Sequence, residues 1–205
     1  MEISEQERSA TDARILAAAA SLFGKLGYNG VSTREIAVAA EVNEVTVYRH
    51  YSRKRDLYLA VLSEELRRVR LPGDQLRKIA EASNARQALV CVFASIDTAI
   101  RERPLVLPLI LYAALQADTD IDALLGRYLG EFIEVLARYL DSWLNAGING
   151  GKFLFGGDSR GMVLALVSIA VFGGSLERVF PGEPARGRTV EALADLCAGT
   201  TELEV

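Results

Sequence analysis

The chain has 205 residues, half of them hydrophobic, and a formal net charge of −4. This composition suits one large helical domain or a small domain beside a larger one, and it excludes disorder on a large scale. The acidic balance also argues against general binding of nucleic acid over the whole surface, although residues 1–70 carry 11 basic against 10 acidic side chains.

The first third of the chain predicts four helices. They are expected after a polar, flexible tail at residues 1–11, over residues 12–26, 33–40, 44–50 and 53–70. Gly27 is placed to end the first helix, because glycine adopts the left-handed conformation easily. Ser32 and Glu35 match the capping box that opens a helix, and Asn43 and Ser52 are suitable N-caps for the next two.

The rest of the chain predicts helices only. They are expected near residues 75–81, 85–103, 105–117, 121–146, 159–180 and 189–197. Pro108 is expected to kink or split the third of these. Alternation typical of a strand occurs only at residues 152–155, which is too short to build a sheet. The sequence therefore predicts an all-α fold.

The helices predicted at residues 33–40 and 44–50 are both short and are joined by a tight turn, which is the helix-turn-helix arrangement. In this arrangement the second helix enters the major groove of DNA and its first residues meet the base edges. The basic run at residues 49–55 would suit such a role. Short helix pairs also occur in other helical proteins, and the basic run can be read as a solvated charged face.

The identities of the residues in this region are a more specific signal of DNA binding than the spacing of the two short helices. The stretch from Ile15 to Leu62 resembles the DNA-binding region of the TetR/AcrR family of bacterial regulators. The resemblance is carried by Leu22-Phe23, Gly27-Tyr28, the run from Ser32 to Ala37, Val42, Thr46-Val47-Tyr48, Tyr51, Lys54 and Leu57. It implies an N-terminal three-helix DNA-binding domain at residues 12–56, joined by the fourth helix to a helical ligand-binding and dimerisation domain at residues 57–205.

The resemblance also implies which residues bind DNA. They are Ser32, Thr33, Arg34, Asn43, Glu44, Thr46, Tyr48, Arg49, His50 and Lys54. Thr46 and Tyr48 would lie on the exposed face of the recognition helix and reach bases or phosphates. His50 and Lys54 would hold phosphates on the two sides of the groove.

Four of these residues have a structural alternative. Tyr48 can be read as a core aromatic and Thr33 as a residue that only starts a helix. His50 can pack against the first helix, and Lys54 can be merely solvated.

The sequence departs from the family pattern at three positions. Glycine is usual where Glu41 stands, a basic residue is common where Glu44 stands, and a small one where Val45 stands. A carboxylate at residue 44 would repel phosphate but could accept a hydrogen bond from a cytosine amino group. These departures leave the operator sequence open.

The family resemblance implies a body that dimerises through its last two long helices. The segment at residues 159–180 is apolar on almost every side and must therefore be covered. We expect a homodimer through the helices near 159–180 and 189–197. The alternative is a central core helix of a monomer.

The resemblance further implies a small-molecule effector held inside the body. The candidate ligand-binding residues are Phe93, Ile96, Leu111, Tyr112, Tyr128, Phe132, Leu136 and Trp143, although apolar side chains at helical spacing can equally be core. Such a lining would suit a hydrophobic or aromatic molecule. The predicted function is a ligand-responsive regulator, in the family's usual form a repressor of near-palindromic operators that is released through a tilt of the fourth helix.

Enzymatic chemistry has little support in the sequence. The chain contains one histidine and no phosphate-binding loop, nucleophile motif or cysteine pair at metal-ligand spacing. The cluster Asp118, Asp120 and Asp122 is interpreted as a helix-capping region, not as a metal site. We therefore expect no enzyme, no cofactor and no metal.

The expected location is the cytoplasm. The first residues are polar, and no apolar stretch reaches the roughly 20 residues of a membrane helix, so no membrane partner is expected. The competing hypothesis is a helical interaction protein of the same fold that does not bind DNA, which the acidic Glu41 and Glu44 favour.

Overall fold

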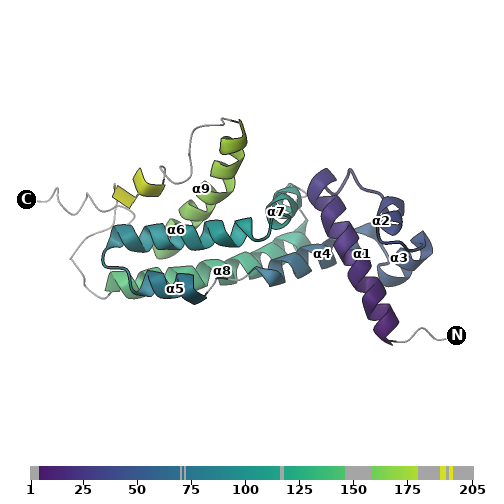
Figure 1. Cartoon of the computed structure of the whole chain (residues 1–205), viewed down its shortest axis with the longest axis horizontal. Coiled ribbons are helices and arrows are strands. Elements are labelled where there is room, and N and C mark those ends of the chain that lie inside the picture. The colour runs from purple at the N-terminus through teal and green to yellow at the C-terminus, as the bar shows by residue number, and fades with distance from the viewer. Residues whose placement is uncertain are drawn as a thin grey trace, which may run out of the picture. The chain divides into compact units, whose positions relative to one another are not determined.

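The computed structural model describes residues 5–69, 71, 73–115, 118–145, 158–179, 190–192 and 194–195, and within these ranges it contains helices and turns but no strand (Figure 1). The helices are α1 (Glu5–Leu26), α2 (Thr33–Ala39), α3 (Glu44–His50), α4 (Lys54–Arg68), α5 (Gly73–Ala80), α6 (Ala85–Arg101), α7 (Val106–Ala114), α8 (Thr119–Asn145) and α9 (Ser159–Val179). The all-α prediction is confirmed. Helical turns at residues 190–192 and 194–195 fall within the predicted last helix, whereas residues 152–155 lie outside the described residues.

The starts of α1 and α4 differ from the sequence-based prediction. α1 begins at Glu5, so the predicted tail is already helical over residues 5–11. This segment contains neither glycine nor proline, and its glutamate, glutamine and arginine side chains all favour helix. The N-cap of α4 is Arg53, not Ser52, and no side chain caps it.

Pro108 does not interrupt α7, contrary to the prediction. The helix runs without a break from Val106 to Ala114. Pro108 is its third residue, and in the first turn of a helix the missing backbone N–H removes no helical hydrogen bond. The proline is therefore compatible with the helix.

The chain folds into two compact units. One contains Met1–Val69 and Arg103–Gly126, and the other contains Arg70–Glu102 and Arg127–Val205. All of α4 and α7 thus belong with the three N-terminal helices. The functional division between residues 12–56 and 57–205 remains a prediction.

An aromatic cluster joins three helices of the N-terminal unit. The Tyr58 ring on α4 lies edge-on to the Phe23 ring of α1 and to the Tyr28 ring, with centroids 5.1 Å apart in both pairs. The Tyr58 hydroxyl donates to the carbonyl of Leu109 on α7 at 2.9 Å. Because a buried hydroxyl needs a partner, this bond specifies where α7 lies, and burial raises the pKa of Tyr58 to about 12.

Two glycines allow the α7 region to lie close to α1. A Cβ atom on Gly24 would lie 2.9 Å from Cδ2 of Leu105, and one on Gly27 would lie 3.0 Å from the Tyr112 ring. Gly27 also has a φ of 73°, which ends α1 in the left-handed conformation as predicted. Tyr112, predicted as a ligand contact, therefore packs against the end of α1.

The C-terminal unit has its own hydrophobic core. Its fully buried members include Ile79, Leu89, Val92, Ile96, Leu136, Val163, Leu166 and Ala170, from α5, α6, α8 and α9. α9 packs through Met162, Val163, Leu166 and Ala170, whereas Leu164 on the same helix is half exposed. The described part of α9 thus has an inner face and an outer face that carries an apolar residue.

The turn between α2 and α3 contains a strained residue. The amide of Glu41 donates to the carbonyl of Val38 at 3.1 Å, and the amide of Val42 donates to the carbonyl of Ala37 at 3.0 Å. These two bonds form a Schellman motif, in which the residue after the C-cap adopts the left-handed conformation. That residue is Glu41, with a φ of 54°, and it is the one non-glycine residue with positive φ in the described part of the chain.

We predict that Glu41→Gly stabilises the fold. A side chain in the left-handed conformation costs about 1–2 kcal/mol, and the greater freedom of glycine in the unfolded chain offsets part of the gain. The free energy of unfolding, measured by urea denaturation, should rise by about 0.5–1 kcal/mol. Glu41→Ala is the control, because it removes the carboxylate but retains Cβ; an equal gain in that variant would show that charge, not backbone strain, is responsible.

Candidate nucleic-acid interface

The start of α2 is held by the capping box that the sequence predicts. The amide of Glu35 donates to the Ser32 hydroxyl at 3.2 Å, and the amide of Ser32 donates to the Glu35 carboxylate at 2.7 Å. The bond from the Ser32 backbone lowers the pKa of Glu35. Arg34, between the two capping residues, is exposed.

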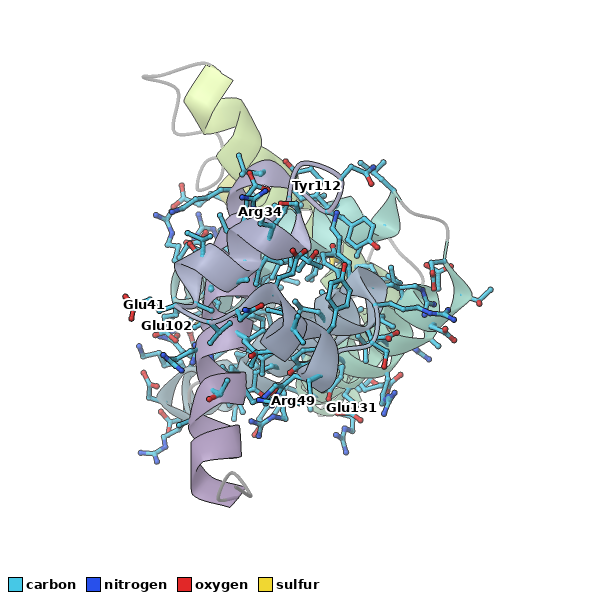
Figure 2. The ribbon with its side chains drawn as sticks, turned by 90° about the vertical axis from the view of Figure 1, so that its right-hand side faces the viewer. Arg34, Glu41, Arg49, Glu102, Tyr112 and Glu131 are labelled. Carbon is cyan, nitrogen blue, oxygen red and sulfur yellow. The ribbon has the colours of Figure 1, made fainter. Side chains whose placement is uncertain are left out.

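α3 has one buried residue and an exposed outer face. Asn43 caps it by accepting from the amide of Val45 at 2.9 Å, as predicted. Val47 is buried, whereas Val45 is 73% and Tyr48 is 48% exposed. Arg49 is also exposed, so the outer face of the helix carries Val45, Tyr48 and Arg49. In Figure 2, where α2 and α3 face the viewer, Arg34 and Arg49 lie apart on this surface and Glu41 projects at its edge.

Three of the predicted DNA-binding residues bond to one another. The Thr33 hydroxyl donates to the Glu44 carboxylate at 2.7 Å and lies 3.1 Å from the Tyr48 hydroxyl. This group connects the first residue of α2 to α3. Tyr48 is therefore not a core aromatic, and Thr33 has a partner beyond its own helix.

His50 does not face outward. Its side chain is 5% exposed, and its Nδ1 atom lies 3.2 Å from the Asp12 carboxylate on α1. The Tyr51 hydroxyl donates to the same oxygen at 2.7 Å, and burial raises the pKa of Tyr51. The prediction that the His50 side chain clamps a phosphate is not supported by this geometry; the imidazole joins α3 to α1 instead.

Lys54, at the start of α4, is partly buried. Its amino group lies 4.4 Å from the centre of the Tyr28 ring, in a cation–π contact. Burial lowers the pKa of Lys54, and the nearby Glu35 carboxylate opposes that shift. Lys54 is thus held in place and not merely solvated, while its phosphate contact remains a prediction.

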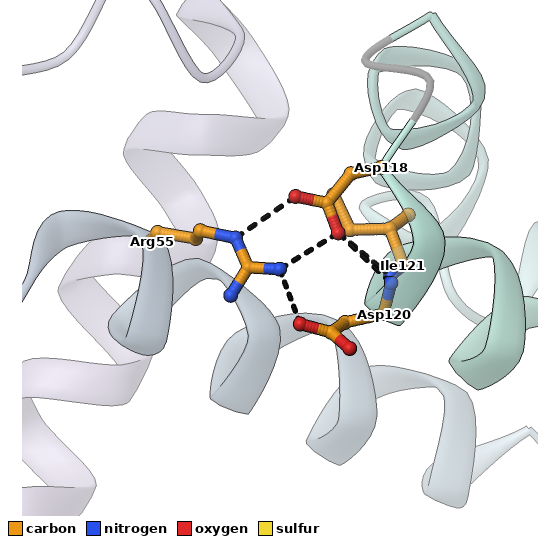
Figure 3. A network of polar contacts seen from close by, with 4 residues as sticks. All are labelled: Arg55, Asp118, Asp120 and Ile121. Carbon is orange, nitrogen blue, oxygen red and sulfur yellow. Dashed lines mark hydrogen bonds and ion pairs between the residues drawn. The ribbon is translucent and has the colours of Figure 1, made fainter.

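The basic run divides into exposed and internal members. Arg49 and Arg53 are exposed, as is Arg34, and none has an ion-pair partner among the described residues. Arg55 instead donates to Asp118 through Nε at 2.9 Å and through its terminal nitrogen at 2.7 Å, and that nitrogen also reaches Asp120 (Figure 3). Arg55 therefore joins α4 to the start of α8 through its ion pairs.

Asp118 is the cap that the sequence predicts. Its carboxylate accepts from the amides of Asp120 and Ile121 at 3.0 and 3.2 Å (Figure 3). In the described ranges of the chain, no group of His, Cys, Asp or Glu side chains could hold a metal ion. The Asp118 carboxylate binds two backbone amides and the Arg55 guanidinium group, and the Asp120 carboxylate binds the same guanidinium group.

Sequence reasoning passed over two exposed residues of this surface. Val45 follows Glu44 on the outer face of α3, and Arg53 stands immediately before α4. Both had a visible signal, since Val45 departs from the family pattern and Arg53 is part of the basic run.

The predicted ligand-binding residues are divided between the two units. Phe93, Ile96 and Leu136 are buried in the core of the C-terminal unit, with Phe132 packed against it. Leu111 and Tyr112 belong to the N-terminal unit, and Tyr128 to the other. Trp143 lies on α8, but its side chain is outside the described residues. The role of these eight residues remains a prediction.

Comparison with known proteins finds similarity over the segment that contains this surface. Residues 15–61 match the family model described as "Bacterial regulatory proteins, tetR family". The chain is 44% identical over 54 residues to the "Uncharacterized HTH-type transcriptional regulator YvkB" of Bacillus subtilis strain 168. That match covers 26% of this chain and 29% of the relative, so it spans less than a third of either protein.

The likeness in fold covers almost the whole chain. The hemolysin II transcriptional regulator HlyIIR has a TM-score of 0.65 at 22% identity, over 93% of this chain and 98% of its own. A "putative transcriptional regulator from Saccharomonospora viridis", solved in complex with choline, has a TM-score of 0.65 at 18% identity, over 96% of this chain and 97% of its own. In the described part of the chain, no helix has the length and apolar character needed to cross a membrane.

We predict that Asp118 stabilises the fold at neutral pH and that this contribution is lost at acid pH. Its carboxyl pKa is lowered from 3.8 to about 2, first by the hydrogen bond from Arg55. A carboxyl group with a lowered pKa stabilises the fold above its unfolded value, and this contribution is lost as the pH falls through the folded value. Asp118→Asn should therefore lower the midpoint of thermal unfolding at neutral pH.

The difference between Asp118→Asn and the wild type should narrow as the pH falls from 3.8 towards about 2. Asp122→Asn is the matched control, because Asp122 is an exposed carboxylate in the first turn of the same helix. A difference that stays constant across this pH range would mean that the Arg55 ion pair does not lower the Asp118 pKa.

Proposed function

We propose that this chain is a transcriptional regulator that binds double-stranded DNA through α2 and α3. Its segment 15–61 matches the bacterial tetR family model, and its fold is similar to that of a solved regulator of the tetR family. The observation that carries this proposal is that the family match and the exposed polar side chains fall on the same two helices. The family match falls on the helices whose outer face carries Arg34, Arg49 and Tyr48. These residue types bind phosphates and base edges.

In the proposed complex α3 enters the major groove. Val47 attaches the helix to its unit, while Thr46 and Tyr48 face the DNA. Arg34 and Arg49 neutralise phosphates, and Ser32 and Asn43 keep the starts of the two helices in place for these contacts. His50 supports α3 from behind through Asp12.

The proposed active form is a homodimer through α9 and the helical turns near residues 190–195. A half-exposed Leu164 on the outer face of α9 supports this, because an apolar side chain gains from being covered. A two-fold dimer presents two recognition helices to major grooves about 34–36 Å apart, and its operators are near-palindromic.

A small-molecule effector is proposed to control binding, with repression as the outcome when no effector is bound. The ligand class proposed from the residues is hydrophobic or aromatic, although the similar Saccharomonospora viridis protein was solved with choline. The effector acts only through its different affinities for the DNA-binding and released conformations. The proposed place of action is the cytoplasm, where the DNA of a bacterium lies.

A second candidate is a helical interaction protein that has lost DNA binding. Glu41, exposed at the edge of the α2–α3 surface, favours it because its charge repels phosphate. The relatives from Bacillus subtilis and HlyIIR are named as transcriptional regulators, and we propose no catalysis. DNA binding is what separates the two remaining hypotheses.

We predict salt-dependent, sequence-specific binding to DNA selected from the gene's own upstream region or from random sequence. Affinity should fall linearly with salt on logarithmic axes, because bound phosphates release counterions. Arg49→Ala and Arg34→Ala should each reduce that slope by about 1. Fluorescence anisotropy at several salt concentrations measures both quantities.

Arg77→Ala is the control for net charge, since it removes an exposed arginine from α5 in the other unit. Its slope and affinity should equal those of the wild type. If no sequence is selected even at low salt, the interaction-protein hypothesis replaces the regulator hypothesis.

A further inference from the structure

We propose that Glu44 is a specificity-determining residue that accepts a hydrogen bond from the amino group of a cytosine in each operator half-site, and that Thr33 holds it in position. This inference rests on the proposed function, because it names the base that the α2–α3 surface reads. It starts from the contact between Thr33 and Glu44.

The hydrogens in this group can be assigned. A carboxylate only accepts, so the single hydroxyl hydrogen of Thr33 points to Glu44 across 2.7 Å. Because that hydrogen is used, the Thr33 oxygen can only accept from Tyr48. The Tyr48 hydroxyl is therefore the donor in this second bond, across 3.1 Å. Tyr48 thus donates to Thr33, and Thr33 donates to one carboxylate oxygen of Glu44. The other carboxylate oxygen of Glu44 has no partner among the described residues.

This arrangement orients an otherwise mobile side chain. Glu44 is the first residue of α3 and is partly buried, so the bond from Thr33 restricts its rotamers before any DNA is bound. A side chain that is already ordered loses less conformational entropy when it makes a contact. Glu44 also lies where a recognition helix meets base edges, because the N-terminal residues of such a helix enter the groove.

The chemistry of the groove selects the base. An ionised carboxylate is repelled by phosphates and by the acceptor atoms of guanine and thymine. Two bases offer an amino donor in the major groove, but the donor of adenine lies beside its N7 acceptor, which a carboxylate disfavours. Cytosine presents its amino group without an acceptor of its own beside it, and it is therefore the base expected opposite Glu44.

The test is selection of binding sites from random DNA with the full chain, followed by affinity measurements on single-base variants of the selected site. The wild type should select cytosine at one position of each half-site, and replacing that base should weaken binding about tenfold. Glu44→Gln should change the preference at that position to adenine, because glutamine pairs with the adjacent donor and acceptor of adenine. Preferences elsewhere in the site should stay unchanged.

Three further variants separate recognition of the base by Glu44 from positioning of Glu44 by Thr33. Glu44→Ala should lose the cytosine preference without gaining one for adenine. Thr33→Val removes the hydroxyl but keeps the shape, and it should weaken the cytosine preference, whereas Thr33→Ser should restore it. Circular dichroism melting establishes that each variant is folded before its selection is compared.

The outcomes distinguish this inference from the proposed function. If wild type and Glu44→Gln select the same site with the same base frequencies, the role of Glu44 is refuted while the regulator hypothesis stands. If the wild type selects no sequence, both are refuted. A preference that moves with residue 44 at one position supports both.

Discussion

The candidate DNA surface depends on two helices that are too short to be stable on their own backbone hydrogen bonds. α2 and α3 have seven residues each, and isolated helices below about 12–15 residues are marginal in water. α3 contributes one buried apolar side chain, Val47. Its position must therefore be fixed by polar side chains at its two ends. Asn43 caps its start, and the Asp12 carboxylate hydrogen-bonds His50 and Tyr51 at its end.

This requirement explains how the polar residues of the surface are distributed. Glu35 completes a capping box and Glu44 accepts from Thr33, so two of the acids near the proposed DNA contacts have a structural partner. Arg55, although part of the basic run, is likewise bound inside its unit. The cations left to meet phosphates are therefore few, and specific base contacts gain importance over general attraction to DNA.

Local signals made most of the helix-turn-helix predictable, whereas distant partners could not be predicted. The capping box and the Asn43 cap involve residues two or three apart, and the sequence alone reveals them. His50 and Arg55 instead find their partners 38 and 63 residues away. A side chain's partner at that separation is decided by packing, which is why a phosphate contact and an exposed basic run were reasonable but incomplete interpretations.

The same packing restricts how an effector could act on DNA binding. A tilt of α4 inside the N-terminal unit would break the bond from Tyr58 to Leu109 and the ion pair from Arg55 to Asp118. A buried hydroxyl left without its partner costs about 1–3 kcal/mol, so such a tilt is unfavourable before any other contact is counted. Movement of α4 together with α7 and Asp118 keeps both contacts. A change in the spacing of two recognition helices is then a displacement of the whole unit.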